Sequence, residues 1–387
     1  MARLGDIATV ITKGTTPTSI GFAFENDGIN FVKIESVDEN GNFVCEKFDH
    51  ISDECHEKLK RSQLQENDIL FSIAGAIGRT AIVTKDILPA NTNQALAIIR
   101  IPQGAINYSF LLYILQSSVV LEQAEKKKQG VAQLNLSLKD IGDFIIPDIP
   151  LEEQRCIVDS LDKVSNLISL RKQQLSKLDE LVKSQFIEMF GSTILNPFGW
   201  KKDNLGAVCD VRDGTHDSPQ YYETGYPLVT SKNVTGGKID LTDCSLICEA
   251  DYKKINERSK VDMGDIIMPM IGTVGKPVIV DIEPSFAIKN VSLIKFEADS
   301  RVLNIYIRAL LQSDYFDDAI LSKVRGGTQK FISLGDIRKL EVLVPPMELQ
   351  EQFAVFVEQI DKLKLAIQKS LNQLETLKKS LMQKYFG

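Results

Sequence analysis

One stretch of the 387-residue chain, Leu151 to Phe190, constrains the fold more than any other. It follows Pro150 and contains neither proline nor glycine before Gly191, so no residue in it breaks a helix. Its apolar residues recur in alternating steps of four and three, which is the spacing of a coiled-coil seam. At about 1.5 Å per residue, the predicted helix is about 60 Å long. The predicted seam comprises Ile157, Leu161, Val164, Ile168, Leu175, Leu178 and Val182.

A helix with a single apolar seam needs a partner, and a second stretch, Met347 to Phe386, carries the same pattern. Pro346 mirrors Pro150 and Gly387 mirrors Gly191, since 346 − 150 and 387 − 191 both equal 196. We therefore predict two long helices that pair antiparallel, rather than two amphipathic helices that pack on separate cores. The second seam comprises Phe353, Val357, Ile360, Ile367, Leu371, Leu374 and Leu381.

The repeat extends beyond the helices into short landmarks that occur once in each half of the chain. They include the turns Gly14–Pro17 and Gly214–Pro219, the strand starts Asn67–Leu70 and Gly264–Ile267, and the turns Gly75–Gly78 and Gly272–Gly275. We predict a mixed α/β (α+β) fold in which two globular units are separated by two long antiparallel coiled-coil helices. The internal tandem repeat implies pseudo-two-fold symmetry. The predicted boundaries are 1–150 and 192–346 for the globular units, and 151–191 and 347–387 for the helices.

Composition bounds the class of protein. The chain is 43% hydrophobic but has no run of about 18 apolar residues, and its start lacks the apolar core of a signal peptide, so a cytoplasmic protein without a membrane span is expected. Its six cysteines form no Cys-x-x-Cys set, and His50, Cys55 and His56 lack zinc-site spacing, so no metal is expected. The net charge of −7 counts against indiscriminate nucleic-acid binding but permits a localised basic surface.

No catalytic motif stands out. The Gly-x-x-Gly turns lack the Gly-x4-Gly-Lys-Ser/Thr spacing of a nucleotide loop, which favours tight β-turns. Asn196–Gly199 is similar to the Asn-Pro-Pro-Phe/Tyr motif of amino-methyltransferases but lacks its second proline, which favours a linker turn. Only three histidines are present, none at metal spacing. The sequence therefore predicts a binding protein without an active site of its own.

Two divergent globular units, each followed by a Pro-Leu-x-x-Gln-type start of a long helix, resemble the specificity subunit of type I restriction–modification enzymes. The second half departs from this pattern at Gly214–Pro219, which has two extra residues, and at Met347–Gln350. The resemblance implies that each globular unit is a target recognition domain reading one half of a bipartite, asymmetric double-stranded DNA sequence. It also implies that the helices act as a spacer and a dock for two adenine-N6 methyltransferase subunits and, through them, for restriction subunits in phage defence. S-adenosylmethionine, ATP and Mg would belong to those partners, with no cofactor in this chain.

In such a protein, phosphate contacts position each unit and a few polar loop side chains read base edges. For any one polar loop residue, a solvated surface role is the competing interpretation. The alternative function is a non-enzymatic coiled-coil scaffold whose two globular units bind proteins. The candidate DNA contacts are loop residues in matching places: Lys13, Thr15, Thr16, Lys33, Arg79 and Gln133 in the first unit, and Thr215, His216, Asp217, Lys232, Lys276, Gln329 and Lys330 in the second.

Overall fold

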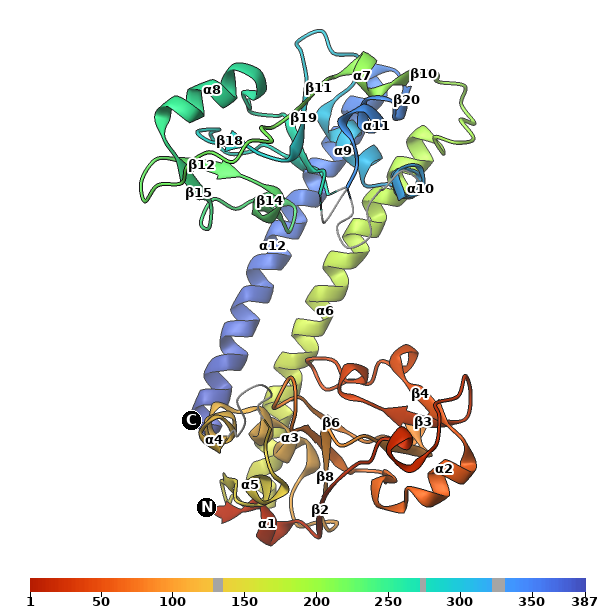
Figure 1. Ribbon diagram of the computed structural model, residues 1–387, viewed down its shortest axis with the longest axis vertical. Coiled ribbons are helices and arrows are strands. Elements are labelled where there is room, and N and C mark those ends of the chain that lie inside the picture. The colour runs from red at the N-terminus through yellow and green to blue at the C-terminus, as the bar shows by residue number, and fades with distance from the viewer. Residues whose placement is uncertain (128–134, 272–275, 322–330) are drawn as a thin grey trace. The chain divides into compact units, whose positions relative to one another are not determined.

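The structure is a computed structural model that describes residues 1–127, 135–271, 276–321 and 331–387 (Figure 1). The chain divides into two compact units. The first unit contains Met1–Arg171 and Ser370–Gly387, and the second contains Lys172–Lys369. Each unit therefore combines one globular part with half of each long helix.

The two long helices are α6 (Leu151–Phe190) and α12 (Met347–Phe386), and each has 40 residues. Both begin directly after a proline, as predicted, and both carry glutamate in the first turn, where a negative charge favours the positive end of the helix dipole. Helix α6 ends at Gly191, whose φ of +77° is the left-handed conformation of a C-terminal glycine cap. Among the described residues, no helix is long and apolar enough to span a membrane.

The described residues of the first unit form three sheets. A four-stranded sheet has the order β2-β8-β5-β6, a three-stranded sheet has the order β4-β3-β7, and β1 pairs with β9. Only β3 and β7 pair in parallel among these strands. The elements are β1 (Ala2–Arg3), α1 (Leu4–Ile7), β2 (Val10–Lys13), β3 (Ile29–Val32), β4 (Asp49–Ile51), α2 (Asp53–Lys58), β5 (Ile69–Ser72), β6 (Thr80–Ile82), β7 (Ala90–Thr92), β8 (Leu96–Arg100), α3 (Tyr108–Gln116), α4 (Ser118–Lys127), α5 (Leu138–Gly142) and β9 (Ile145–Ile146).

The second unit repeats this plan strand for strand. Its four-stranded sheet has the order β11-β19-β16-β17, its three-stranded sheet has the order β15-β12-β18, and β10 pairs with β20; a small hairpin, β13-β14, is added. The elements are β10 (Lys201–Asn204), α7 (Leu205–Val208), β11 (Asp210–Asp213), β12 (Tyr226–Val229), β13 (Val234–Thr235), β14 (Lys238–Ile239), β15 (Ser245–Ile247), α8 (Glu249–Ser259), β16 (Ile266–Pro269), β17 (Val278–Ile279), β18 (Ala287–Ile288), β19 (Val291–Lys295), α9 (Asn304–Leu311), α10 (Asp314–Leu321), α11 (Leu334–Arg338) and β20 (Glu341–Val344). The internal repeat predicted from the sequence is thus confirmed as a repeat of topology.

In each unit, both long helices contribute to the main hydrophobic core. In the first unit, Ile157 and Leu161 of α6 share a buried cluster with Phe386 of α12. In the second, Phe186 of α6 packs against Phe353 of α12, with ring centroids 5.6 Å apart. Within this second unit Asp179 pairs with Lys364 at 2.5 Å, so moving back along α6 means moving forward along α12. The helices therefore run antiparallel, as predicted.

The predicted seam positions are all buried or half-buried along α6 and α12. Leu161 and Phe353, which belong to the main hydrophobic cores, are both 0% exposed. Ile168, Leu175, Leu178, Val182, Ile367, Leu374 and Leu381 are half-buried. Several leucines off the seam are exposed instead, so the two faces of each helix differ in burial.

Candidate nucleic-acid interface

A buried glutamine ties the start of each long helix to the globular part of its unit. Gln154 accepts a hydrogen bond from the backbone N–H of Asn107 at 2.8 Å and donates to the carbonyl of Ile149 at 2.7 Å. Asn107 is the N-cap of α3. Gln154 is only 4% exposed. A polar side chain can be buried there because both the oxygen and the nitrogen of its amide are hydrogen-bonded. This contact explains the glutamine of the first Pro-Leu-x-x-Gln motif.

Gln350 does the same in the second unit. Its amide oxygen accepts from the N–H of Leu303 at 2.8 Å, and its nitrogen donates to the carbonyls of Arg301 at 3.0 Å and Pro345 at 2.9 Å. Leu303 is the N-cap of α9, which corresponds to α3. The long helices therefore hold equivalent short helices through equivalent side chains.

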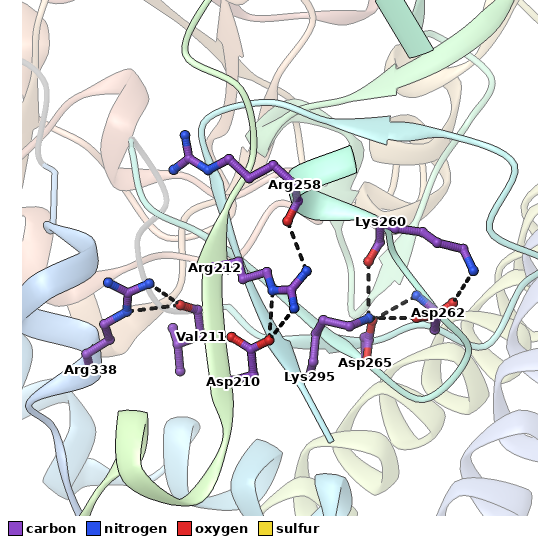
Figure 2. Close-up of polar contacts among 9 residues, drawn as sticks. All are labelled: Asp210, Val211, Arg212, Arg258, Lys260, Asp262, Asp265, Lys295 and Arg338. Carbon is purple, nitrogen blue, oxygen red and sulfur yellow. Dashed lines mark hydrogen bonds and ion pairs between the residues drawn. The ribbon is translucent and has the colours of Figure 1, made fainter. Parts of the chain in front are cut away.

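Each four-stranded sheet is braced by an ion pair at equivalent strands. In the first unit, Arg100 at the end of β8 binds Asp68 through two bonds of 2.7 Å, and the Asp68 side chain is fully buried. In the second unit, Lys295 at the end of β19 binds Asp265 at 2.6 Å and Asp262 at 2.8 Å (Figure 2). Burial opposes the charge of Lys295, but these two carboxylates outweigh burial and raise its pKa.

A second set of contacts fixes strand β11, which leads into the Gly214 turn (Figure 2). Arg212 donates to the carboxylate of Asp210 at 2.7 Å and to the carbonyl of Arg258 at 3.0 Å. Arg338 donates to the carbonyl of Val211 through both Nε and Nη2, at 3.0 and 2.6 Å. The guanidinium groups of Arg212 and Arg338 thus hold β11 where it leads into the turn.

In each unit the Gly-Thr turn crosses over the segment that leads into an inner strand of the four-stranded sheet, β8 in the first unit and β19 in the second. In the first unit, the N–H of Thr15 donates to the carbonyl of Thr92 at 3.1 Å. A Cβ at Gly14 would lie 1.9 Å from that same carbonyl oxygen, so only glycine fits. We call the segments 14–17 and 92–95 the crossing loops of the first unit.

The crossing loops of the second unit, 214–219 and 288–291, follow the same geometry. The N–H of Thr215 donates to the carbonyl of Ile288 at 3.0 Å, and Gly214 donates to Val291 at 3.0 Å. A Cβ at Gly214 would lie 2.4 Å from the Ile288 oxygen. The two units therefore present two loops each on one common backbone frame.

The structure separates the first unit's candidate residues. Thr15 and Thr16 lie on a crossing loop, and Lys13 lies half-buried just before it. Lys33 instead pairs with Asp49 and sits 4.9 Å from the centre of the Phe24 ring. Arg79 donates to the carbonyls of Ile34 and Val37, at 3.1 and 3.0 Å. Lys33 and Arg79 therefore have structural partners within the unit.

In the second unit His216 is held between two oxygen acceptors. Its Nδ1 lies 2.9 Å from Oδ1 of Asn290, and its Nε2 lies 2.9 Å from Oδ2 of Asp213. The hydrogen bond with Asn290, followed by that with Asp213, raises the pKa of His216, because the doubly protonated ring donates to both oxygens. Asp213 is 7% exposed and also pairs with Arg258, so the carboxylate that holds the imidazole is itself held in place.

A cavity of about 380 Å³ opens beside His216. It is lined by Thr215, His216, Asp217, Ser218, Pro219, Asp251, Lys254, Ile255, Arg258 and Ser259. Three of the predicted candidates, Thr215, His216 and Asp217, are thus brought together on this loop. Lys232, in a short 3-10 helix (Ser231–Asn233), and Lys276 are exposed elsewhere in the unit. Gln133, Gln329 and Lys330 lie outside the described residues, as does the Gly272–Gly275 turn.

Sequence reasoning missed the second crossing loop of each unit. Gln94 accepts a hydrogen bond from the hydroxyl of Thr16, 78 residues earlier in the chain. Asn290 occupies the corresponding place beside His216, 74 residues away. Nearby, the buried Lys289 donates to Ser218 at 2.6 Å. The sequence signal that pairs the two amides is the repeat offset, since 290 − 94 equals 196, whereas Thr16 and His216 correspond when Gly14 is aligned with Gly214.

Within the described parts of the chain, no three histidine, cysteine, aspartate or glutamate side chains group so as to hold a metal ion. The polar groups around the crossing loops are hydrogen-bond donors and acceptors on exposed loops. Such groups suit recognition of a polar surface such as the edges of base pairs.

Comparison with known proteins places the chain in a family. Residues 1–180 and 197–376 each match the Type I restriction modification DNA specificity domain. The type I restriction enzyme MjaVIII specificity subunit of Methanocaldococcus jannaschii is 24% identical over 339 residues, which cover 82% of this chain and 78% of that protein. The EcoBI specificity subunit of Escherichia coli is 32% identical over 184 residues, 46% of this chain and 38% of that protein.

Solved structures show the same fold. A chain from a study of complex assembly and conformational transition of the type I R-M system aligns over 100% of this chain and 96% of its own, with a TM-score of 0.57 and 20% identity. The type I restriction–modification S subunit of M. genitalium aligns over 100% and 95%, with a TM-score of 0.55 and 15% identity. The resemblance inferred from the sequence is thereby confirmed: the chain belongs to the type I restriction–modification DNA specificity family, as a specificity subunit that recognises a DNA sequence.

Proposed function

We propose that this specificity subunit recognises a bipartite, asymmetric DNA sequence, with one half-site read by each globular part. The observation that carries the proposal is the pair of crossing-loop frames. The backbone bonds of Thr15 and Thr215 are equivalent, while the loop side chains beside them differ. One frame with two sets of side chains suits two different short sequences, because base edges are read by side chains and not by the backbone frame.

We further propose that two copies of an adenine-N6 methyltransferase subunit dock on the long helices. Exposed leucines recur at the repeat offset, since 363 − 167 and 377 − 181 both equal 196. Leu167 and Leu363 are 44% and 53% exposed, and Leu181 and Leu377 are 44% and 45% exposed. Large apolar side chains left exposed in two equivalent places suit two equivalent contacts with one kind of partner.

On this proposal the chemistry belongs to the partners. The methyltransferase subunits bind S-adenosylmethionine and transfer the methyl group, and restriction subunits, where they join the complex, use ATP and Mg. This chain contributes the choice of sequence. Its acidic net charge of −7 suits that division, because the partners supply part of the positive surface that faces DNA.

The test is a methylation map. The chain is purified together with its methyltransferase subunit, unmethylated genomic DNA is treated with S-adenosylmethionine, and modified adenines are located by sequencing. A two-part motif with a constant spacer is expected, and omission of this chain should abolish it. Replacing Met1–Pro147 with the first globular unit of another family member should change one half of the motif only. A single uninterrupted motif, or a change in both halves, would contradict the proposal; the alternative of a protein-binding scaffold predicts no motif at all.

A further inference from the structure

The crossing loops of both units carry one amide side chain in the same place. Gln94 lies two residues after Thr92, and Asn290 lies two residues after Ile288; Thr92 and Ile288 are the residues whose carbonyls hold the Gly-Thr turns. The partner of each amide lies two residues after the crossing glycine, at Thr16 and at His216. The pairs Thr16–Gln94 and His216–Asn290 are therefore equivalent, and we call them the cross-loop pairs.

The two cross-loop pairs span the space between the crossing loops with side chains of different lengths. In the first unit a short side chain, Thr16, meets a long one, Gln94. In the second unit the long ring of His216 meets the shorter Asn290. In both pairs the contact is made to the oxygen of the amide. The amide is thus oriented in the same sense in each unit, although neither residue type is shared.

Orientation by its oxygen leaves the rest of the amide available. An amide oxygen has two lone pairs and the amide nitrogen has two N–H donors. The neighbouring hydroxyl or imidazole occupies one lone pair, so one acceptor site and both donors remain. Gln94 is exposed and Asn290 is half-exposed, so these groups face solvent. An adjacent donor and acceptor on one amide match the N7 acceptor and N6 donor of adenine in the major groove.

The support of the second pair is stiff. The Asp213 carboxylate beneath His216 is 7% exposed and is shared with Arg258. The backbone carbonyl of Arg258 is in turn held by Arg212 (Figure 2). Asn290 has a φ of +55°, a left-handed conformation that asparagine adopts more readily than most residues. Because its backbone conformation and its hydrogen-bond partner are both fixed, the Asn290 side chain loses little conformational entropy when it binds a base.

We propose that Gln94 and Asn290 are the equivalent adenine readers of the two half-sites, and that Thr16 and His216 are their positioning residues. This inference rests on the proposed bipartite recognition and adds to it a named base and a named residue in each unit. Gln94 and Asn290 are not among the DNA contacts predicted from the sequence, whereas Thr16 and His216 are, and here they position the amides.

The test substitutes one amide at a time in the full chain assembled with its methyltransferase subunit. Asn290→Asp keeps the side-chain shape and tolerates the left-handed backbone, but it removes both N–H donors. The substrates are duplexes that carry each of the four base pairs at every position of both half-sites. Methylation rates at subsaturating DNA then give the preference for each base pair.

At one position of one half-site, the preference for adenine should fall about 5- to 140-fold, which is the discrimination expected of a bidentate amide contact. The other half-site should keep its preferences. Gln94→Glu should produce the reciprocal result, with one adenine lost in the opposite half-site. His216→Ala should relax discrimination at the same base pair as Asn290→Asp, and His216→Gln, which restores a donor to Asn290, should recover part of it.

Gln220→Glu is the matched control, because Gln220 is an exposed amide that follows the same crossing loop and the change adds the same negative charge. It should slow methylation of all duplexes alike. Asn290→Gly, which also tolerates the backbone conformation, guards against effects peculiar to a carboxylate and should lose the same preference.

The inference is overturned if Asn290→Asp and Asn290→Gly leave every base preference unchanged, or if they slow all duplexes equally, as the Gln220 control does. It is also overturned if the lost preference is for a base other than adenine. Failure of the proposed function looks different: the unsubstituted complex would then show no two-part motif. Retention of the other half-site's preferences in each variant shows that the chain has folded and assembled.

Discussion

Replacement of Gln350 by methionine tests whether the buried glutamine fastens the long helix to its unit. Methionine has nearly the same length and shape but cannot make the three hydrogen bonds to Leu303, Arg301 and Pro345. Gln350 is 0% exposed, so water cannot replace the lost partners. Orphaning a buried N–H costs about 1–3 kcal/mol, and the loss of each carbonyl bond costs about 1 kcal/mol. We expect the second unit to lose about 3–5 kcal/mol of unfolding free energy.

The chain has a built-in reporter for this measurement. Its one tryptophan, Trp200, belongs to the second unit and donates its indole N–H to the carbonyl of Phe190 at 3.1 Å. Tryptophan emission during urea denaturation therefore follows the second unit. With a denaturant slope of roughly 2 kcal/mol per molar urea, the midpoint of Gln350→Met should fall by about 1.5–2.5 M.

Gln154→Met is the internal comparison, because it removes the equivalent contacts from the first unit. It should lower a far-ultraviolet circular dichroism transition while leaving the Trp200 transition in place. Gln352→Met, on the exposed side of the first turns of α12, controls for the methionine itself and should shift neither. The reasoning is refuted if Gln350→Met moves the Trp200 midpoint no more than Gln352→Met does.

Four further predictions address charge, seam, docking and spacing. The raised pKa of His216 means that its bonds stabilise the second unit fully below pH about 6.5 and that this contribution fades as pH rises through the folded-state pKa; His216→Gln should remove that pH dependence from the Trp200 transition. Leu371→Asp places an unpaired charge at a position that is 5% exposed, so methyltransferase assembly should fail in size-exclusion chromatography, and intact assembly would show that the seam faces solvent. Leu167→Asp or Leu363→Asp alone should leave one bound methyltransferase copy and the double variant none, measured by light scattering; loss of both copies from either single change would argue against two equivalent docks. Insertion of four residues at equivalent places in both long helices adds about one helical turn, roughly 5–6 Å, so the methylated motif should gain one or two spacer base pairs at about 3.4 Å each, and an unchanged spacer would mean that the helices do not set it.

The sequence alone determined the features that depend on local pattern. The bounds of α6 and α12 follow from Pro150, Gly191 and Pro346, because proline starts a helix readily and glycine ends one, and the heptad steps between them require a partner helix. The constant offset of 196 between Pro150 and Pro346 predicted the tandem repeat, and equivalent local patterns then produced the same strand order twice.

Tertiary structure decided which polar side chains meet. Lys33 and Arg79 have the positive charge and the loop position expected of DNA contacts. Within the unit, however, Lys33 pairs with Asp49, and Arg79 donates to the carbonyls of Ile34 and Val37. Conversely, Gln94 carries no motif and becomes a candidate only because Gly14 brings its loop beneath Thr16. A hydrogen bond forms between groups that are close in space, and residues 78 positions apart in the chain become close only through the sheet that holds their loops.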